Sequence, residues 1–157
     1  MSKRASISMN DQEVADFLAG RHVMNMATIG PTGRPHLVGM WYGWAPDGRL
    51  ACHTYPRSQK IKNLERNPAL TALVEDGAVY DELRGVQLMC DAEIVDDRDI
   101  VHAVAESTYE RYTAEQSGPL NDDTRPFLHA YVAKRVAVLL DVVDTASWDH
   151  AKLQSAT

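Results

Sequence analysis

Six segments of the chain have the hydrophobic pattern of β-strands, in which apolar residues alternate with polar ones or run continuously. They span residues 22–29, 36–45, 50–55, 69–75, 83–95 and 135–143. The connections GPTGRP and APDG, between the first three segments, are rich in glycine and proline and short enough for hairpins. The pattern therefore predicts an antiparallel β-sheet.

Helices are predicted in the remaining segments. Asn10 and Glu13 have the spacing of a capping box, which predicts a helix ending before Gly20. Further helices are predicted over residues 59–66, over 98–112 and from 125 to about 133. These helices do not alternate regularly with the strands, and the chain contains neither GxGxxG nor GxxxxGK[ST]. We expect a mainly β (α+β) fold: an antiparallel barrel or sandwich with accessory helices.

Length, composition and charge indicate which classes of protein the chain can belong to. A chain of 157 residues with 45% hydrophobic residues has the size and composition of a single domain, here residues 1–157 with tails at 1–9 (flexible) and 144–157. The net charge of −6 disfavours nucleic acid as a partner. No apolar run reaches the roughly 20 residues that span a bilayer, and the polar N-terminus lacks a signal-like apolar core. We expect a cytoplasmic protein without a membrane partner.

The sequence contains no familiar catalytic or metal-binding motif. Its six histidines and two cysteines show no HxH, HExxH or CxxC spacing, so we expect no metal site. There is also no GxSxG elbow to mark a nucleophile. If the protein is an enzyme, the difficult chemistry then belongs to a bound cofactor.

A cluster of cationic side chains stands out against the acidic background. Residues 57–66 contain four cations together with neutral polar side chains: Arg57, Lys60, Lys62 and Arg66, with Ser58, Gln59 and Asn63. A local positive region of this kind suits a phosphorylated small molecule. The alternative is that these charges form the solvated face of a helix.

The second strand is unusually aromatic. Trp41, Tyr42 and Trp44 fall within four residues, and Gly39 and Gly43 would let another group approach the backbone. A flat conjugated ring could lie along this strand, although aromatic residues in a strand more often fill a core or a subunit contact. The next strand leads directly into residues 57–66, which favours a flavin-like molecule with a phosphorylated side chain.

Four motifs together resemble the split-barrel flavin/deazaflavin oxidoreductase family, which includes pyridoxamine 5'-phosphate oxidase. They are MATIGPTGRPHLVGMWY, HTYPRSQKIKNLERNPALTALVEDG, YDELRGVQLMCDAEIVDD and SWDHAKL, and the likeness covers residues 11–153. The SQKxxNLxxNP, YDELRGV and WDHxKL segments resemble the branch that uses the deazaflavin coenzyme F-420. The resemblance implies a homodimer of six-stranded antiparallel split β-barrels of the FMN-binding type. It also implies two cofactor sites at the subunit interface, near the C-terminal tail.

The resemblance also implies roles for individual residues. Residues expected along the cofactor ring are Val38, Gly39, Met40 and Trp41, with Thr54 at its edge. Residues expected at the phosphate and ribityl chain are Ser58, Gln59, Lys60 and Asn63, and those at the oligoglutamate tail are Arg57 and Lys62. Residues expected from the partner chain are Tyr80, Trp148, Asp149 and His150. His53 and Tyr80 are the candidate proton donors.

The function implied by this resemblance is hydride transfer between reduced coenzyme F-420 and an unsaturated or aromatic small-molecule acceptor. Two alternatives stay open: an FMN-dependent oxidase or reductase, and a non-catalytic protein that binds a flavin, heme or tetrapyrrole. Pyridoxamine 5'-phosphate itself is not the expected substrate. That substrate would need a second basic cluster, and outside residues 57–66 the sequence offers no comparable one, only the pair Lys134 and Arg135 near the last strand.

Overall fold

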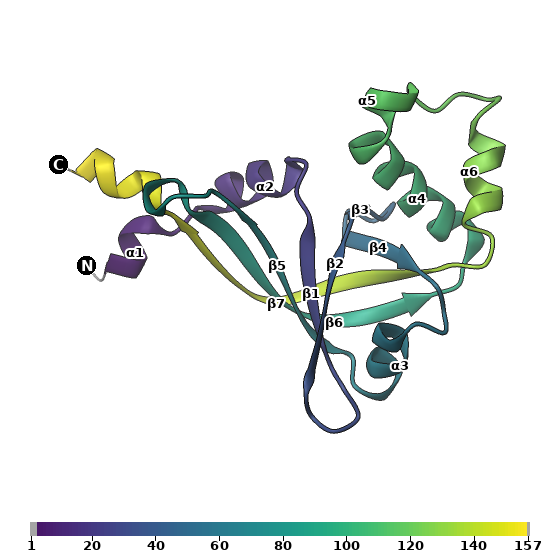
Figure 1. The fold of residues 1–157 in the computed structure, drawn as a ribbon, viewed down its shortest axis with the longest axis horizontal. Helices are drawn as coiled ribbons and strands as arrows, with labels where there is room; N and C mark the ends of the chain where they lie inside the picture. The colour runs from purple at the N-terminus through teal and green to yellow at the C-terminus, as the bar shows by residue number, and fades with distance from the viewer. Residues whose placement is uncertain (1–2, 157) are drawn as a thin grey trace.

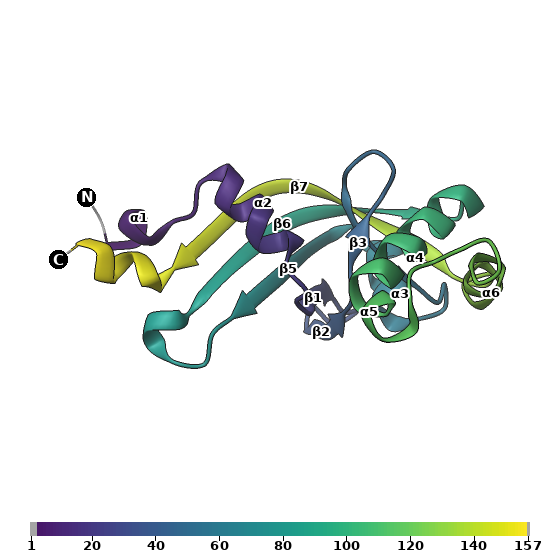
Figure 2. The ribbon, with the colours of Figure 1, turned by 90° about the horizontal axis from the view of Figure 1, so that it is seen from above.

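Seven strands form one antiparallel sheet that curls into a partly open barrel in the computed structural model, which describes residues 3–156 (Figures 1 and 2). The strands are β1 (Met24–Ile29), β2 (Pro35–Met40), β3 (Gly43–Trp44), β4 (Leu50–Thr54), β5 (Ala69–Asp76), β6 (Arg84–Val95) and β7 (Val136–Asp149). Their order across the sheet is β2-β1-β5-β6-β7-β4-β3. The prediction of a mainly β antiparallel fold is confirmed.

The number of strands differs from the predicted six because residues 36–45 form two strands instead of one. β2 and β3 lie at opposite edges of the sheet, so Trp41 and Tyr42 carry the chain directly from one edge to the other. Tyr42 is fully buried at this crossing, and its hydroxyl donates a hydrogen bond to the Leu18 carbonyl at 2.8 Å. The crossing brings the two edges together and makes the sheet a barrel.

The inward side chains of the strands form the main core. Alternation is clearest in β1 and β5, where every second residue is buried. The largest fully buried apolar side chains of this core are Tyr42, Met24, Met26, Ile61, Leu140, Val74, Val86 and Val138. Ile61 comes from helix α3 (Gln59–Arg66), which closes one end of the barrel.

Three helices between β6 and β7 form a second layer. They are α4 (Arg98–Tyr112), α5 (Ala114–Ser117) and α6 (Arg125–Tyr131), which gather over β3 and β4 at one end of the molecule (Figure 1). α4 contributes Val101, Val104 and Ala105 to a smaller core with Ala51 and Leu139, on the outer side of the barrel wall. Glu106 joins α6 to α4, because it accepts hydrogen bonds from Arg125 and His129.

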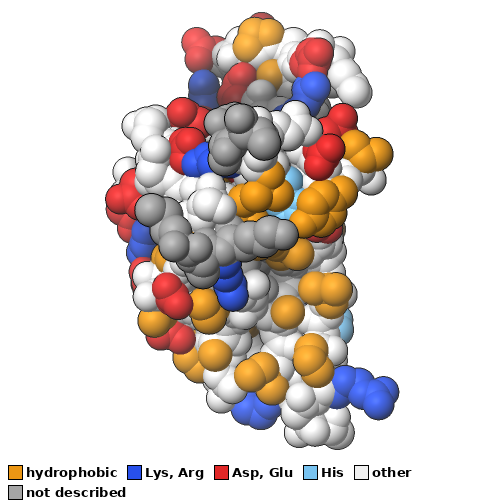
Figure 3. Space-filling view, turned by 90° about the vertical axis from the view of Figure 1, so that its left-hand side faces the viewer, with side chains coloured by type: hydrophobic (Ala, Val, Ile, Leu, Met, Phe, Trp, Pro, Cys, Tyr) orange, Lys and Arg blue, Asp and Glu red, His pale blue; other side chains and the backbone are white. Residues whose placement is uncertain are grey.

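The outer face of the sheet keeps exposed apolar side chains. Ile29, Leu37 and Val143 are 39%, 65% and 70% exposed. Ile29 and Val143 line a hollow of about 450 Å³ together with Met89. Hydrophobic side chains lie together on the lower half of the face shown in Figure 3, toward the β1–β2 hairpin.

Regular secondary structure extends into both of the segments that were expected to be tails. The segment 1–9 contains α1 (Lys3–Ile7), and residues 144–149 extend β7, which pairs with β6 as far as Asp149 opposite Arg84. The strand continues past its predicted end at Val143 because exposed polar residues can extend a strand whose backbone has a partner. The 3-10 helix η2 (His150–Ala156) follows β7.

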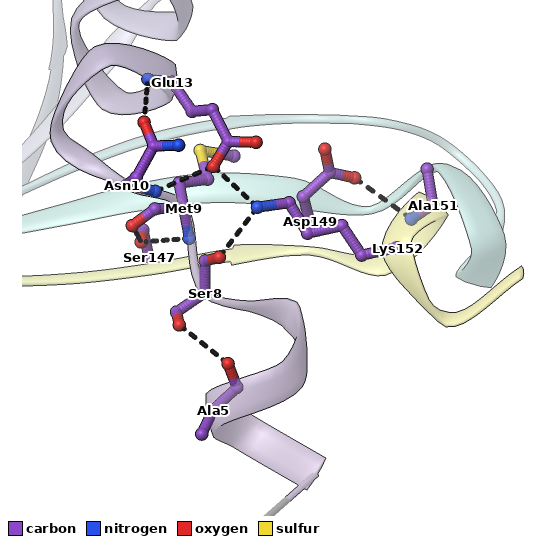
Figure 4. Close-up of polar contacts among 9 residues, drawn as sticks. All are labelled: Ala5, Ser8, Met9, Asn10, Glu13, Ser147, Asp149, Ala151 and Lys152. Carbon is purple, nitrogen blue, oxygen red and sulfur yellow. Dashed lines mark hydrogen bonds and ion pairs between the residues drawn. The ribbon is translucent and has the colours of Figure 1, made fainter. Parts of the chain in front are cut away.

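The N-terminal segment is attached to this extended strand by hydrogen bonds (Figure 4). The Met9 amide donates to Ser147 Oγ at 3.0 Å, and Lys152 Nζ contacts Glu13 at 2.6 Å. Glu13 and Asn10 form the predicted capping box of helix α2 (Asp11–Ala19). The predicted end of that helix at Gly20 is also confirmed.

Arg111, in the last turn of α4, holds the crossing in place. Its guanidinium donates to the Tyr42 carbonyl at 3.0 Å and to carbonyls at the end of α2, including Gly20 at 2.7 Å. The same group lies 4.5 Å from the Tyr42 ring and 4.4 Å from the Trp44 ring. A cation is favourable here, since helix C-termini carry partial negative charge.

We expect Arg111→Ala to lower the free energy of unfolding by about 2–3 kcal/mol, because several partly buried carbonyls lose their donor. Urea unfolding followed by tryptophan fluorescence measures this change. The control is Arg21→Ala, which removes an exposed ion pair with Glu115 and should cost less than about 1 kcal/mol. Equal effects of the two substitutions would contradict the part assigned to Arg111.

Candidate functional site

A cavity opens where two strand edges face each other without pairing. Within residues 3–156, β2 pairs only with β1, and β4 pairs with β3 only at Leu50 and Ala51. The edge of β2 at Gly39–Met40 and the end of β4 at His53–Thr54 therefore keep backbone groups free of strand partners. Gly39, Met40, Trp41 and His53 line a cavity of about 300 Å³ beside these edges.

The residues predicted along a cofactor ring divide between two faces of β2. Val38 and Met40 pack against the barrel core, whereas Gly39 and Trp41 alternate with them toward the outside. Trp41 is 53% exposed and stacks on Tyr112 with the ring centroids 4.8 Å apart. The backbone of the four residues thus borders the cavity along one edge. Their side chains do not form a single surface.

A glycine at position 43 is explained by packing against α4 and not by contact with a ligand. A Cβ added at Gly43 would lie 2.6 Å from Ser107 Oγ of α4. Ser107 also accepts a hydrogen bond from the Trp44 amide at 3.0 Å. The close approach predicted at this glycine is therefore made by α4.

The N-terminus of α3 has polar groups without internal partners. Ser58 is the N-cap residue, and its buried Oγ has no hydrogen-bond partner among residues 3–156; the same is true of His36 Nδ1. Lys60, at the second position of α3, forms no ion pair within that part of the chain. Partial burial lowers the pKa of Lys60. A hydroxyl, a desolvated ammonium and free helix N–H groups together fit a phosphate.

Sequence reasoning did not single out His36, whose Nδ1 is buried without a partner among residues 3–156. Its place follows from the strand register, which sets His36 opposite Thr28. Thr28 in turn accepts a hydrogen bond from Asn63 Nδ2 of α3 at 2.9 Å. These links join segments that lie far apart in the sequence, so no local pattern predicts them.

Asn63 positions α3. Its side chain is fully buried, and its amide oxygen accepts a hydrogen bond from Gln59 Nε2 at 2.8 Å while its nitrogen is bonded to Thr28. Arg57 and Lys62 are exposed beside the helix. Ligand contact by these residues stays a prediction.

Thr54 and His53 point to opposite sides of β4. Thr54 is buried, and Cys52, on the same side of the strand, belongs to the barrel core; burial raises the pKa of Cys52 to about 12, so this thiol stays protonated. His53 faces the α4–α6 layer and lines the cavity. Burial, reinforced by the charge of Arg135, lowers the pKa of His53 to about 4.

His53 is therefore a neutral imidazole near pH 7. Its Nδ1 lies 3.2 Å from Arg135 Nη1, which can only donate, so Nδ1 accepts and the ring proton is on Nε2. In this form His53 can donate one hydrogen bond but is not a cationic acid. Arg135 was noticed in the sequence only as a neighbour of Lys134, because 82 positions separate it from His53.

A second cavity of about 550 Å³ adjoins the first beneath α4–α6. The two cavities share Trp41, His53, Thr108 and Arg135. Apolar and aromatic side chains form most of the remaining wall: Ala105, Tyr109, Leu120, Phe127, Leu128 and Tyr131.

Tyr80 and Trp148 lie far from this site within one chain. Tyr80 belongs to the turn η1 (Tyr80–Glu82) at the tip of the β5–β6 arm, near the chain ends, whereas α3 is at the other end of the molecule (Figures 1 and 2). The rings of Tyr80 and His150 meet edge to face with their centroids 4.5 Å apart, and the Trp148 ring lies against Gly85, where an added Cβ would come within 2.5 Å of it. Only a second copy of the chain could bring this arm to the cavity.

Among residues 3–156, no three His, Cys, Asp or Glu side chains come together as a metal site would need. The helices of the same part of the chain include none that is long and apolar enough to cross a bilayer.

The sequence matches a known family. A sequence profile of the pyridoxamine 5'-phosphate oxidase family matches residues 10–148. The chain belongs to this family. Members of the pyridoxamine 5'-phosphate oxidase family include oxidoreductases, and no match is found among curated proteins.

Solved structures show the same fold. The conserved hypothetical protein Rv2991 from Mycobacterium tuberculosis is 43% identical over 98% of this chain and 93% of its own, with a TM-score of 0.89. An F420 reductase is 25% identical over 83% of this chain and 94% of its own, with a TM-score of 0.59. A putative 5-nitroimidazole antibiotic resistance protein from Bacteroides thetaiotaomicron is 18% identical over 90% and 85%, with a TM-score of 0.67, and shows the fold alone.

Proposed function

We propose that the protein is a reductase that transfers a hydride from reduced coenzyme F-420 to an unsaturated or aromatic acceptor. The observation that carries this proposal lies at the start of α3, where Ser58 Oγ is buried without a partner among residues 3–156, two positions before the partly desolvated Lys60. Unsatisfied buried polar groups are costly, which supports a ligand at this position. The similar F420 reductase supports the deazaflavin as that ligand.

The coenzyme, when bound, supplies the hydride. The chain's residues bind and orient it: Ser58 and Lys60 would hold the phosphate, and the unpaired edges of β2 and β4 would hydrogen-bond the ring. Trp41, which stacks on Tyr112, would form an aromatic wall of the cavity beside the ring. The neutral His53 would donate its Nε2 proton in a hydrogen bond to an acceptor oxygen, which orients that acceptor.

The site residues of the partner chain would complete the cavity in a homodimer. The exposed apolar face around Ile29, Leu37 and Val143 supports such an interface, because soluble monomers rarely expose contiguous apolar surface. The β5–β6 arm with Tyr80 and Trp148 would then reach the other subunit's cavity. In this arrangement each site is built from both chains.

Val143→Asp should convert the dimer to a monomer, because it places a charge on the apolar face. Size-exclusion chromatography with light scattering measures the mass, and we expect at least a tenfold rise in the dissociation constant. Asp144→Asn, which changes a neighbouring exposed residue, is the control. A parent protein that is monomeric at micromolar concentration would overturn this arrangement.

FMN is the second candidate cofactor, since Ser58 and Lys60 would suit either phosphate. The two candidates are separated by titrating the purified protein with FMN and with F-420 at equal concentrations. We expect tighter binding of F-420, and oxidation of reduced F-420 when menadione is added as an acceptor. Preference for FMN would replace the deazaflavin, whereas tight binding without turnover of any acceptor would favour a carrier.

Lys60→Ala should weaken F-420 binding by about 1.5–3 kcal/mol, roughly 10- to 100-fold in the dissociation constant, because a charge-assisted contact is lost. Isothermal titration calorimetry gives this constant directly. Lys134→Ala removes an exposed lysine outside α3 and should leave it unchanged. A Lys60→Ala variant that binds the coenzyme as tightly as the parent would exclude Lys60 from the phosphate site.

A further inference from the structure

Arg135 lies at the junction of the two cavities and has no counter-ion in the described part of the chain. Its guanidinium lies 4.7 Å from the Tyr55 ring and 4.4 Å from the Tyr131 ring. Its Nε is buried with no hydrogen-bond partner among residues 3–156, and no ion pair joins Arg135 to a carboxylate of that range. Its one side-chain hydrogen bond in that range is to the neutral His53.

The neighbouring cation has a different arrangement. Arg98 is paired with Asp96, and its remaining groups donate to the carbonyls of Ala133 and Arg135. The donors of Arg98 are therefore used by local carbonyls and by Asp96, whereas Arg135 keeps N–H donors that have no acceptor among residues 3–156. A partly buried guanidinium with free donors suits an anionic oxygen, which it can bind with two hydrogen bonds.

The cavity that Arg135 faces is apolar and aromatic. Phe127 and Tyr131 of α6 are 77% and 64% exposed, yet both line the 550 Å³ cavity together with Trp41 and Leu128. This volume is in the range of small-molecule sites, and its walls suit a flat apolar body. An acidic group would be attracted to Arg135, and the flat body would lie along the aromatic walls.

We propose that this second cavity binds the acceptor, and that the acceptor is a planar aromatic molecule carrying a carboxylate that Arg135 anchors. The identification of the bound molecule as the acceptor rests on the proposed reductase function. The binding site itself is inferred independently, from Arg135 and the cavity walls. The hydride-receiving part of the molecule then lies toward Trp41 and His53, which belong to both cavities. Arg135 is a binding and specificity-determining residue in this account.

The test uses two probes of the same shape, 2-naphthoate and the neutral 2-naphthamide. Calorimetric titrations are made on coenzyme-free protein and on protein saturated with F-420. We expect the parent to bind naphthoate at least tenfold more tightly than naphthamide, and Arg135→Gln to abolish this preference while keeping naphthamide binding. Lys134→Gln, which removes the adjacent exposed charge, should keep the preference.

A second readout reports the place of binding. Neutralising Arg135 with a bound carboxylate should raise the pKa of His53, so its NMR titration midpoint should move upward with naphthoate but not with naphthamide. Equal binding of the two probes, binding of neither, or a preference that survives Arg135→Gln would overturn the inference. Failure of F-420 to bind, with the naphthoate preference intact, would instead overturn the proposed function alone.

Discussion

The contact between Arg111 and the Trp41–Tyr42 crossing determines where everything else in the protein lies. Two residues take the chain from one edge of the sheet to the other, and one guanidinium joins this crossing to the end of α2 and to α4. Burial raises the pKa of Tyr42 to about 12, so its phenol stays protonated and donates to the Leu18 carbonyl. The sheet is thereby closed on one side of the crossing and left open on the other.

The open side is where the polar groups lack partners. The backbone edges of β2 and β4 border this opening, and Ser58, with its unpartnered Oγ, begins the helix that follows β4, whereas the interior of the barrel is apolar. Arg135 adds, on the outer side of β4, a cation that has no counter-ion among residues 3–156. Proteins keep unsatisfied groups mainly at functional sites, so their concentration here is the physical basis of the proposed function.

Local chemistry was sufficient to predict several elements from the sequence. The Asn10–Glu13 capping box and Gly20 fixed both ends of α2, and the alternation of Val86, Leu88 and Cys90 identified β6. The basic segment was correctly predicted as the helix α3 after β4. Each of these signals lies within a few residues of the element that it defines.

Other features depend on contacts between distant segments, which the sequence alone does not contain. Residues 36–45 all favour strand, so the change of sheet edge at Trp41 was missed. β7 continues through the polar residues after Val143 because β6 offers a backbone partner there. His53 and Arg135 come together only because β4 pairs with β7.

The central claim is that the opening between β2, β4 and the start of α3 binds the anionic coenzyme. Hydrogen–deuterium exchange with mass spectrometry, with and without saturating F-420, tests it most directly, because backbone protection reports the place of contact. The account predicts slower exchange in residues 37–41 and 53–61. Protection confined to other segments, with these two unchanged while the coenzyme is bound, would contradict it.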